Sequence, residues 1–301
     1  MTLLISTPGV YSRPDGIVGV SGPDRIPYLH SLLSQDFENA AIGTVAEFLY
    51  LDGKGDHLAS GTAVVHAEAV YLIVPASLAA DVAERLDRFR FMMQCEVTDL
   101  SGDWAVASVR GPGQVEAPGA PSRPMTAAPH APGIVLRDRD GGVDLVGPTE
   151  WVTARVAELD LPAASAEDWD RWRISAARPA WGSEIGPGRR SQELGLLPTH
   201  VHLKKGCYPG QESIAKIHNL GRPRRALALL ESDAPLAVGA ALGEGRRPGE
   251  VTSAAATEDG RTIALGLVPF TDGALPATVA TPAGQATVVK AVGAGLSQPG
   301  A

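Results

Sequence analysis

Apolar residues in the first quarter of the chain follow two different periods. In 22–33 and in 77–89 they recur every three or four positions, the spacing of one buried face of a helix. Between these stretches, 46–51 reads as a strand that runs into an Asp-Gly-Lys-Gly turn, and 62–66 with 70–74 reads as a hairpin. The pattern therefore predicts a mixed α+β unit.

The next stretch predicts further strands and then a long irregular connection. Apolar residues alternate in 91–97, which predicts a strand with Cys95 on its buried face, and 104–109 predicts another strand. Six prolines then fall between Arg110 and Gly133, where no period survives. We expect 111–133 to be a loop or linker.

A second set of elements repeats the first in outline. A hairpin is predicted for 134–136 with 143–146, followed by helices over 149–159 and 165–177. Ser165 with Asp168 resembles a capping box, and Trp169 with Trp172 is typical of a core face. Strand–strand–helix mixtures occurring twice suggest two α+β lobes related by a pseudo-repeat.

The last third changes character at about residue 226. Before it, 182–197 is irregular, and His200-Val201-His202-Leu203 reads as a strand with both histidines on one side. After it, short Ala/Val/Leu runs alternate with Gly/Pro turns, which predicts a small antiparallel barrel or sandwich. The expected organisation is a region 1–225 of two lobes, a β-barrel over 226–296 and a tail over 297–301.

Composition restricts the classes of function. The 301 residues carry a net charge of −8, which argues against a direct, sequence-independent nucleic-acid binder. Cys95 and Cys207 are the two cysteines, and neither belongs to a Cys-x-x-Cys or Cys/His ligand spacing, so no metal site is predicted. No apolar run has the length of a membrane span and the N-terminus lacks a signal-peptide pattern, so we expect a cytoplasmic protein.

Candidate chemistry concentrates in Lys204–Glu212, whose sequence is KKGCYPGQE. Glycines and Pro209 indicate a tight, stiff loop around Cys207, and the helical pattern resumes at Gln211. A cysteine beside two lysines and just before a helix N-terminus favours the thiolate, which predicts a reactive Cys207 rather than a core residue.

The same region is strongly basic. From Lys204 to Arg225, six basic residues face the single acid Glu212, which gives a segment charge of +5. This segment is either a solvated basic face or an anion site for carboxylates or phosphates.

Several stretches together resemble one known family. KGCYPGQE matches the KGCYxGQE signature of the YgfZ-like folate-binding proteins, the iron–sulfur accessory branch of the glycine-cleavage T-protein superfamily. Similar stretches, which cover most of the chain, are SGPDRIPYLHSLLSQDF from Ser21, EFLYLDGKG from Glu47, RFRFMM from Arg88, RWRISAARP from Arg171, QELGLLP from Gln192 and GEVTSAAATEDGRTIALGLV from Gly249.

This resemblance implies a T-protein-like three-lobed ring, with two related α+β lobes, a C-terminal antiparallel β-barrel and a central channel for tetrahydrofolate or a one-carbon-substituted folate. The implied role is support of iron–sulfur cluster assembly or repair, with iron–sulfur client or assembly proteins as partners, tRNA-modifying enzymes among them. The residues expected to act in chemistry are Cys207 and Lys205. Those expected to bind folate are Arg173, Glu193, Tyr208, Gly210, Gln211, Glu212, Arg222 and Arg224.

Two residues depart from the family pattern, and the first departure counts against aminomethyl transfer. T-proteins carry a catalytic aspartate on the strand after the Gly-rich turn, where this chain reads His57-Leu58-Ala59-Ser60, and many relatives have a glutamate at the position of Ser175. A folate-dependent aminomethyl or one-carbon transferase is the main alternative, although it needs a positioned acid or base. A protein-interaction module with a vestigial pocket is the other.

Overall fold

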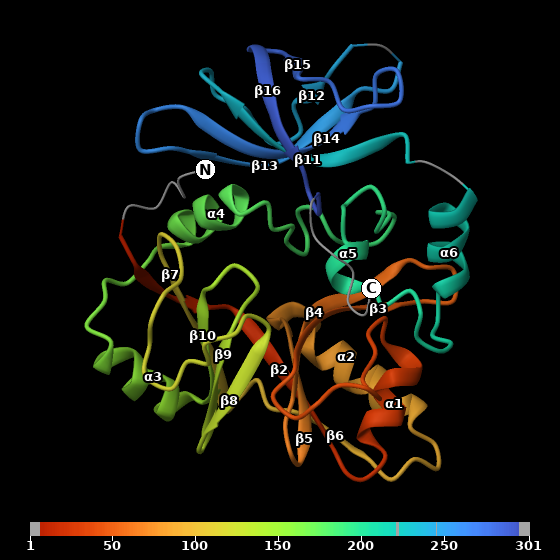
Figure 1. The fold of residues 1–301 in the computed structure, drawn as a ribbon, viewed down its shortest axis with the longest axis vertical. Helices are drawn as coiled ribbons and strands as arrows, with labels where there is room; N and C mark the ends of the chain where they lie inside the picture. Colours follow the sequence, from red (N-terminus) through yellow and green to blue (C-terminus); the bar gives the residue numbers. More distant parts are fainter. Residues whose placement is uncertain (1–6, 221–222, 245, 295–301) are drawn as a thin grey trace.

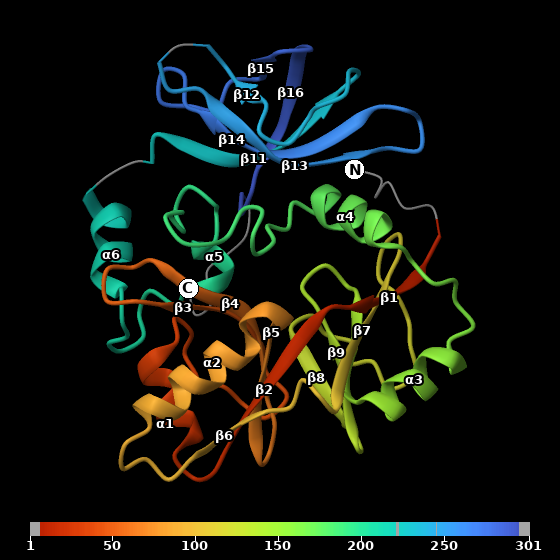
Figure 2. The same ribbon diagram turned by 180° about the vertical axis from the view of Figure 1, so that it is seen from behind.

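The computed structural model describes residues 7–220, 223–244 and 246–294, with the backbone alone for 217–220. Two mixed lobes lie side by side, and a six-stranded sheet lies across them so that the three lobes surround a common centre (Figure 1). The view from behind shows the same arrangement (Figure 2). The predicted architecture of two α+β lobes plus a nearly closed antiparallel barrel is confirmed.

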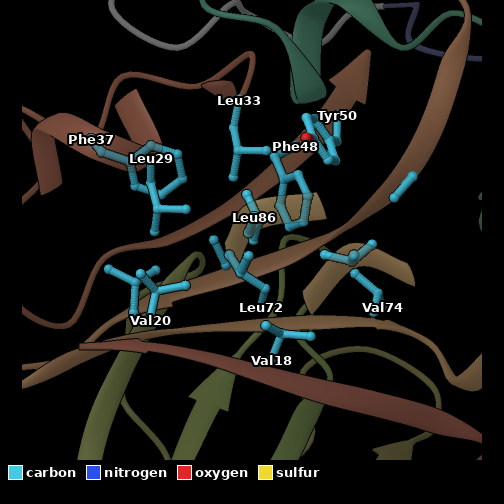
Figure 3. Close-up of a cluster of buried hydrophobic side chains, with 14 of the residues drawn as sticks. Val18, Val20, Leu29, Leu33, Phe37, Phe48, Tyr50, Leu72, Val74 and Leu86 are labelled. Carbon is cyan, nitrogen blue, oxygen red and sulfur yellow. The ribbon is translucent and has the colours of Figure 1, made fainter. Parts of the chain in front are cut away.

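Lobe one is a five-stranded antiparallel sheet with two helices on one face. Figure 3 shows Leu29, Leu33 and Leu86 from the helices in one buried cluster with Phe48 and Leu72 from the strands. Burial of such side chains contributes roughly 1.5–3 kcal/mol each. In sheet order the strands are β3 (Val45–Leu51), β4 (His57–Val65), β5 (Ala69–Pro75), β2 (Asp15–Ser21) and β6 (Glu96–Asp99), and the helices are α1 (Arg25–Leu32) and α2 (Ala76–Phe89).

One predicted strand of this lobe is wrong at its start. Phe91 and Met92 are 88% and 95% exposed in a turn, and the strand begins only at Glu96. Phe91 has a left-handed backbone (φ 40°), which interrupts the extended conformation, and the Asp24 carboxylate accepts a hydrogen bond from the amide of Gln94 at 2.6 Å. Cys95 is buried, as predicted for a core residue.

Lobe two is built on the same plan. Its antiparallel sheet has the order β1 (Gly9–Arg13), β7 (Trp104–Arg110), β10 (Val143–Pro148), β9 (Gly133–Arg137) and β8 (Thr126–His130), and α3 (Thr149–Glu158) packs against β7 and β10. Strand β8 lies inside the proline-rich stretch that the sequence predicts to be loop. An edge position explains how this strand accommodates Pro129, because an edge strand can leave one backbone N–H unused.

The two lobes are joined by apolar side chains from both sheets. Ile17, Val64 and Ile73 of lobe one share a buried cluster with Leu136 and Val146 of lobe two. A backbone hydrogen bond from the amide of Val45 to the carbonyl of Met125 extends the junction. The lobes are therefore fixed against each other, which fixes the space between them.

The third lobe is an antiparallel sheet of six strands. The short Ala/Val/Leu runs after residue 226 form strands, and the structure also contains the two-residue β12, which the sequence pattern does not show. In sheet order they are β12 (Ala241–Leu242), β13 (Gly249–Ala256), β14 (Thr262–Pro269), β11 (Arg225–Ser232), β16 (Gly284–Ala291) and β15 (Thr278–Thr281).

The segment between lobe two and the barrel wraps around the centre. It contains α4 (Ala166–Ser175), α5 (Leu197–His200) and α6 (Gln211–Leu220). Ser165 caps α4 with the predicted capping box: its hydroxyl accepts from the amide of Asp168. Ile185, Leu194 and Leu196 of this segment form one apolar cluster with Leu51 of lobe one and Leu265 of the barrel, which we call the central joint.

Gly210 is required by this packing. It has φ +81°, and a Cβ there would lie 2.7 Å from the carbonyl oxygen of Asp52. Gly188 has a similar φ of +76° with nothing within 4 Å of a Cβ. We expect Gly188→Ala to cost about 1 kcal/mol for the left-handed backbone, and Gly210→Ala to cost about 2–4 kcal/mol because a rigid backbone oxygen must also move.

Urea unfolding of both variants measures the two costs. Equal losses of unfolding free energy would show that the close approach of Gly210 to the β3–β4 turn does not constrain the fold.

Candidate functional site

The loop Lys204–Glu212 is fastened to lobe one by Lys205. The Nζ of Lys205 donates to the carbonyl oxygens of His30 and of Leu33, the latter at 2.5 Å, at the end of α1. The same ammonium lies 4.8 Å from the ring centroid of Tyr208. Burial lowers the pKa of Lys205 to about 8 and raises that of Tyr208 to about 12. Lys205 thus positions the loop.

Cys207 is exposed, whereas Cys95 is buried. The sulfur is therefore accessible from solvent. Cys207 does not appear among the described residues that line the cavity between the two lobes and α4. The predicted reactive residue and this cavity therefore lie at different places on the molecule.

A cavity of about 300 Å³, which we call the central cavity, lies where the two lobes and α4 meet. It is bounded by strands of both lobes, by α4 and by the irregular segment that follows α4. Its aromatic and charged lining residues are Tyr11, Arg13, Asp15, Glu47, Arg139, Trp169, Trp172, Arg173, Arg178, Trp181 and His200.

One wall of the central cavity is aromatic. Tyr11 stacks on Trp169 with ring centroids 5.0 Å apart, and Trp169 lies 4.9 Å from Trp172. Arg13 lies 5.5 Å from the Trp169 ring, and Arg178 lies 5.1 Å from that of Trp172. The sequence predicts the two tryptophans as core residues, and Trp172 is buried, but both also present surface to the cavity.

The remaining walls are charged. Four arginines and two carboxylates line the cavity, and each of these arginines is ion-paired with at least one carboxylate. Arg178 pairs with Asp138 at 3.1 Å, with Asp140, and with Glu47 at 3.8 Å. Burial opposes the charge of Arg178, but these carboxylates outweigh it and raise its pKa.

Glu47 is the carboxylate best placed to contact a ligand. One oxygen, Oε2, accepts a hydrogen bond from Arg139, whereas Oε1 has Arg178 as its ion-pair partner at 3.8 Å. Burial alone would raise the pKa of Glu47, but Arg139, His200 and Arg178 outweigh burial and lower it. Glu47 is therefore ionised at neutral pH, and Oε1 can accept a hydrogen bond.

Among the predicted ligand-binding residues that the structure describes, Arg173 is the one that lines the central cavity. Its guanidinium binds Glu184 Oε2 at 3.2 Å and donates to the hydroxyl of Ser253 at 2.8 Å. The Glu184 carboxylate also accepts from the amide of Ala180 at 2.9 Å and from Ser253 at 2.5 Å. Glu184 therefore holds Arg173 and the segment after α4 in place.

Glu193 lies elsewhere, between the wrapping segment and the barrel. Its carboxylate binds Arg225 Nε at 3.0 Å, and its carbonyl accepts from the amide of Leu227 at 2.6 Å. The other predicted binding residues also lie outside the cavity lining. Tyr208 and Gly210 are buried in the motif loop, Gln211 and Glu212 begin α6, Arg224 is exposed, and Arg222 falls outside the described residues.

Sequence reasoning missed Glu47, Arg139, Arg178 and Glu184 as site residues. Glu47 was available as a charged residue within an otherwise apolar strand, and Glu184 as an acid in an irregular stretch. No sequence pattern around Arg139 or Arg178 indicates a site, because both reach the cavity only when the two lobes pack together.

The histidine pattern is also different from the prediction. His200 ends helix α5, so His200 and His202 do not share a strand face, and the side chain of His218 falls outside the described residues. Among the side chains that the structure describes, no group of three His, Cys, Asp or Glu residues is arranged to hold a metal ion. The described helices include none with the length and apolar composition to cross a membrane.

The fold is shared with a solved structure of a T-protein. The glycine cleavage system aminomethyltransferase T of Bartonella henselae matches 98% of this chain and 88% of its own length, with a TM-score of 0.80 and 18% identity. No protein-family model matches the chain.

Curated relatives give the sequence comparison. An aminomethyltransferase of Moorella thermoacetica is 28% identical over 84% of this chain and 76% of its own length. Proteins named tRNA-modifying protein YgfZ are 35% identical over 34% of either chain in Aliivibrio fischeri, and 22% identical over 87% of this chain and 85% of the relative in Colwellia psychrerythraea. The chain is a YgfZ-like member of the T-protein superfamily.

A further relative is longer than this YgfZ-like chain. A protein of Arabidopsis thaliana, named as an unconfirmed chloroplastic transferase, is 25% identical over 79% of this chain. The match spans 59% of the plant protein's length.

His200 links the stability of this YgfZ-like protein to pH. Burial, together with Arg139 and Arg178, lowers the pKa of His200 to about 4 against the opposing effect of Glu47. Because the unfolded chain binds this proton near pH 6.5 and the folded chain does not, stability is fully present above pH 6.5 and falls as the pH drops toward 4.

We expect His200→Gln to remove on the order of 2–3 kcal/mol of this pH dependence between pH 6.5 and 4. Urea unfolding of both proteins across that range measures it. If the unfolding free energy of the variant depended on pH as strongly as that of the wild type, the assignment to His200 would be contradicted.

Proposed function

We propose that this protein binds tetrahydrofolate, or a one-carbon-substituted folate, and supports iron–sulfur cluster assembly or repair. The enzymes supported in this way would be cluster-dependent ones, such as tRNA-modifying enzymes. We expect the protein to act in the cytoplasm. The observation that carries the proposal is the central cavity, which combines an aromatic wall with four arginines.

The chemistry of the cavity suits each part of a reduced folate. Flat rings pack well against aromatic side chains such as those of Trp169 and Tyr11, which line the cavity. A carboxylate oxygen such as Glu47 Oε1 can accept from the amino and ring N–H groups of a pterin. Arginines such as Arg13 and Arg173 suit carboxylates of a glutamyl tail.

The relatives support the link to tRNA modification. The proteins of Aliivibrio fischeri and Colwellia psychrerythraea are named for that role. The net charge of −8 favours an indirect contribution, through a partner enzyme, over direct binding of tRNA.

The exposed Cys207 suits contact with an iron–sulfur client or assembly protein. A partner can reach the sulfur without entering the ring, and Lys205 fixes the loop that presents it. We propose that folate occupies the centre while Cys207 acts at the outer surface.

A folate-dependent aminomethyl or one-carbon transferase is the second candidate. Strand β4 lacks the aspartate of the T-proteins, but Asp15 on β2 and Glu47 on β3 bring carboxylates to the same cavity. Such a group could serve as the acid or base that transfer needs. Turnover of an aminomethyl-lipoyl substrate by the purified protein would favour this function, and its absence would favour the accessory role.

Tetrahydrofolate binding is testable by calorimetry with a matched pair of tryptophan variants. Trp169→Ala removes a ring that lines the cavity, and we expect Kd to rise about tenfold. Trp151→Ala removes a ring packed against Gly133 in lobe two, outside the cavity lining, and should leave Kd unchanged. Absence of heat with any reduced folate, or equal losses in the two variants, would reject the central cavity as the folate site.

The role of Cys207 is testable with the second cysteine as the control. We expect iodoacetamide to modify Cys207 in the folded protein, and Cys207→Ala to abolish that modification. Because Cys95 is buried, Cys95→Ala should leave the extent of modification unchanged. Cells carrying Cys207→Ala should lose activity of a cluster-dependent tRNA-modifying enzyme although folate affinity is retained. Normal enzyme activity in those cells would exclude a role for the thiol.

A further inference from the structure

A second, separate cavity lies where the β3–β4 turn meets the start of α6. Its volume is about 130 Å³, and it shares none of its described lining residues with the central cavity. The segment after Gly186 forms its third side. The lining residues are Lys54, Gly55, Asp56, Gly188, Arg189, Arg190, Ser191, Gln192, Ser213 and Ile214.

Three cations converge on this cavity from two segments of the chain. Lys54 belongs to the β3–β4 turn, and Arg189 and Arg190 belong to the segment after Gly186. Arg189 pairs with Glu250, which is outside the cavity, at a donor–acceptor distance of 2.5 Å. Within residues 7–220, 223–244 and 246–294, neither Lys54 nor Arg190 has an ion-pair partner, and Asp56 is the one acid in the lining.

The floor of the cavity is neutral. Ser191 lies 2.8 Å from Nε2 of His57, whose Nδ1 lies 3.2 Å from the carbonyl oxygen of Gly186. Burial lowers the pKa of His57, so Nδ1–H donates to Gly186 and Nε2 accepts the Ser191 hydroxyl. His57 therefore adds no positive charge beneath the cavity. The charged residues of the lining are the three cations and Asp56.

The walls are fixed before any ligand arrives. The Ser213 hydroxyl donates to the carbonyl of Lys54 at 2.7 Å, and the Gln192 amide donates to the carbonyl of Ile214 at 3.1 Å. A Cβ on Gly55 would lie 2.7 Å from Cβ of Ser213, so the turn and the helix are in close contact. Fixed walls reduce the ordering cost of binding.

We propose that this cavity binds an oxyanion of phosphate or carboxylate size carried by a small molecule. Lys54 and Arg190 are exposed and have no carboxylate partner among the described residues, in a chain whose net charge is −8, and both line this concave site. Ammonium and guanidinium groups bind such oxyanions with charge-assisted hydrogen bonds. The basic segment after Lys204 contributes Ser213 and Ile214 to the lining, but its Lys204 and Lys216 do not line the cavity.

Inorganic phosphate is the first probe. The thermal midpoint of the full chain is measured against sodium phosphate, with sodium chloride at matched ionic strength as the reference. We expect a saturable rise in the midpoint with phosphate only, since a ligand that binds the folded state stabilises it. A rise that matches chloride at every concentration would overturn the proposal.

Variants then assign the effect to the cavity. Lys54→Ala with Arg190→Ala should weaken phosphate binding at least about tenfold. Lys204→Ala with Lys216→Ala removes the same charge from exposed positions and should leave it unchanged. Equal losses in the two double variants would mean that net charge, and not this cavity, accounts for binding.

The source of the oxyanion is tested with mono- and triglutamyl tetrahydrofolate. If Lys54→Ala with Arg190→Ala weakens only the triglutamyl form, the site takes tail carboxylates. If both folates are unaffected while phosphate binding is lost, the site takes a separate phosphate-bearing ligand. Intact binding of both folates with no phosphate effect in the wild type would refute this site and leave the central folate site untouched.

Discussion

Closure of the ring depends on the ion pairs of Arg178. This residue lies between α4 and the central joint, and its guanidinium reaches Asp138 and Asp140 in lobe two and Glu47 in lobe one. Asp138 also pairs with Arg110 at 2.9 Å. Burial would raise the pKa of Asp138, but the two arginines outweigh it and the pKa falls to about 2. Losing one partner would leave uncompensated buried charge, which costs several kcal/mol.

The same ion pairs give the centre of the molecule its chemistry. Apolar side chains fill the contact between the lobes and the central joint, so the polar groups that close the ring gather in the remaining space. Arg178 and Glu47 both structure that space and line it. A ligand there would meet groups whose charges and positions are already fixed, which is the condition for tight binding of a small anionic molecule.

The sequence predicted the lobes much better than the site. Periodicity is a local property, so the hairpin β4–β5, the capping box at Ser165 and the barrel strands could be read directly from spacing. Strand β8 was missed because prolines mask strand patterns, and the edge position that permits Pro129 is a property of the whole sheet.

The site was harder to predict because its residues come from segments that are distant in sequence. The motif loop stood out through its composition and is indeed a fixed loop, but nothing local shows that it faces outward. Arg173 could be placed through the resemblance, whereas Glu47 and Arg139 meet only once the two lobes pack. The second cavity could not be predicted from the sequence either, since its cations Arg190 and Lys54 are 136 positions apart in the chain.

The central joint also limits how the protein can be divided. Its apolar residues come from lobe one, from the wrapping segment and from the barrel, with Leu51, Ile185 and Leu265 as one member of each. A fragment that stops before β11 would present the leucines and isoleucines of this cluster to water, the kind of contiguous apolar surface that drives aggregation. A recombinant version that lacks the barrel should therefore be recovered in inclusion bodies.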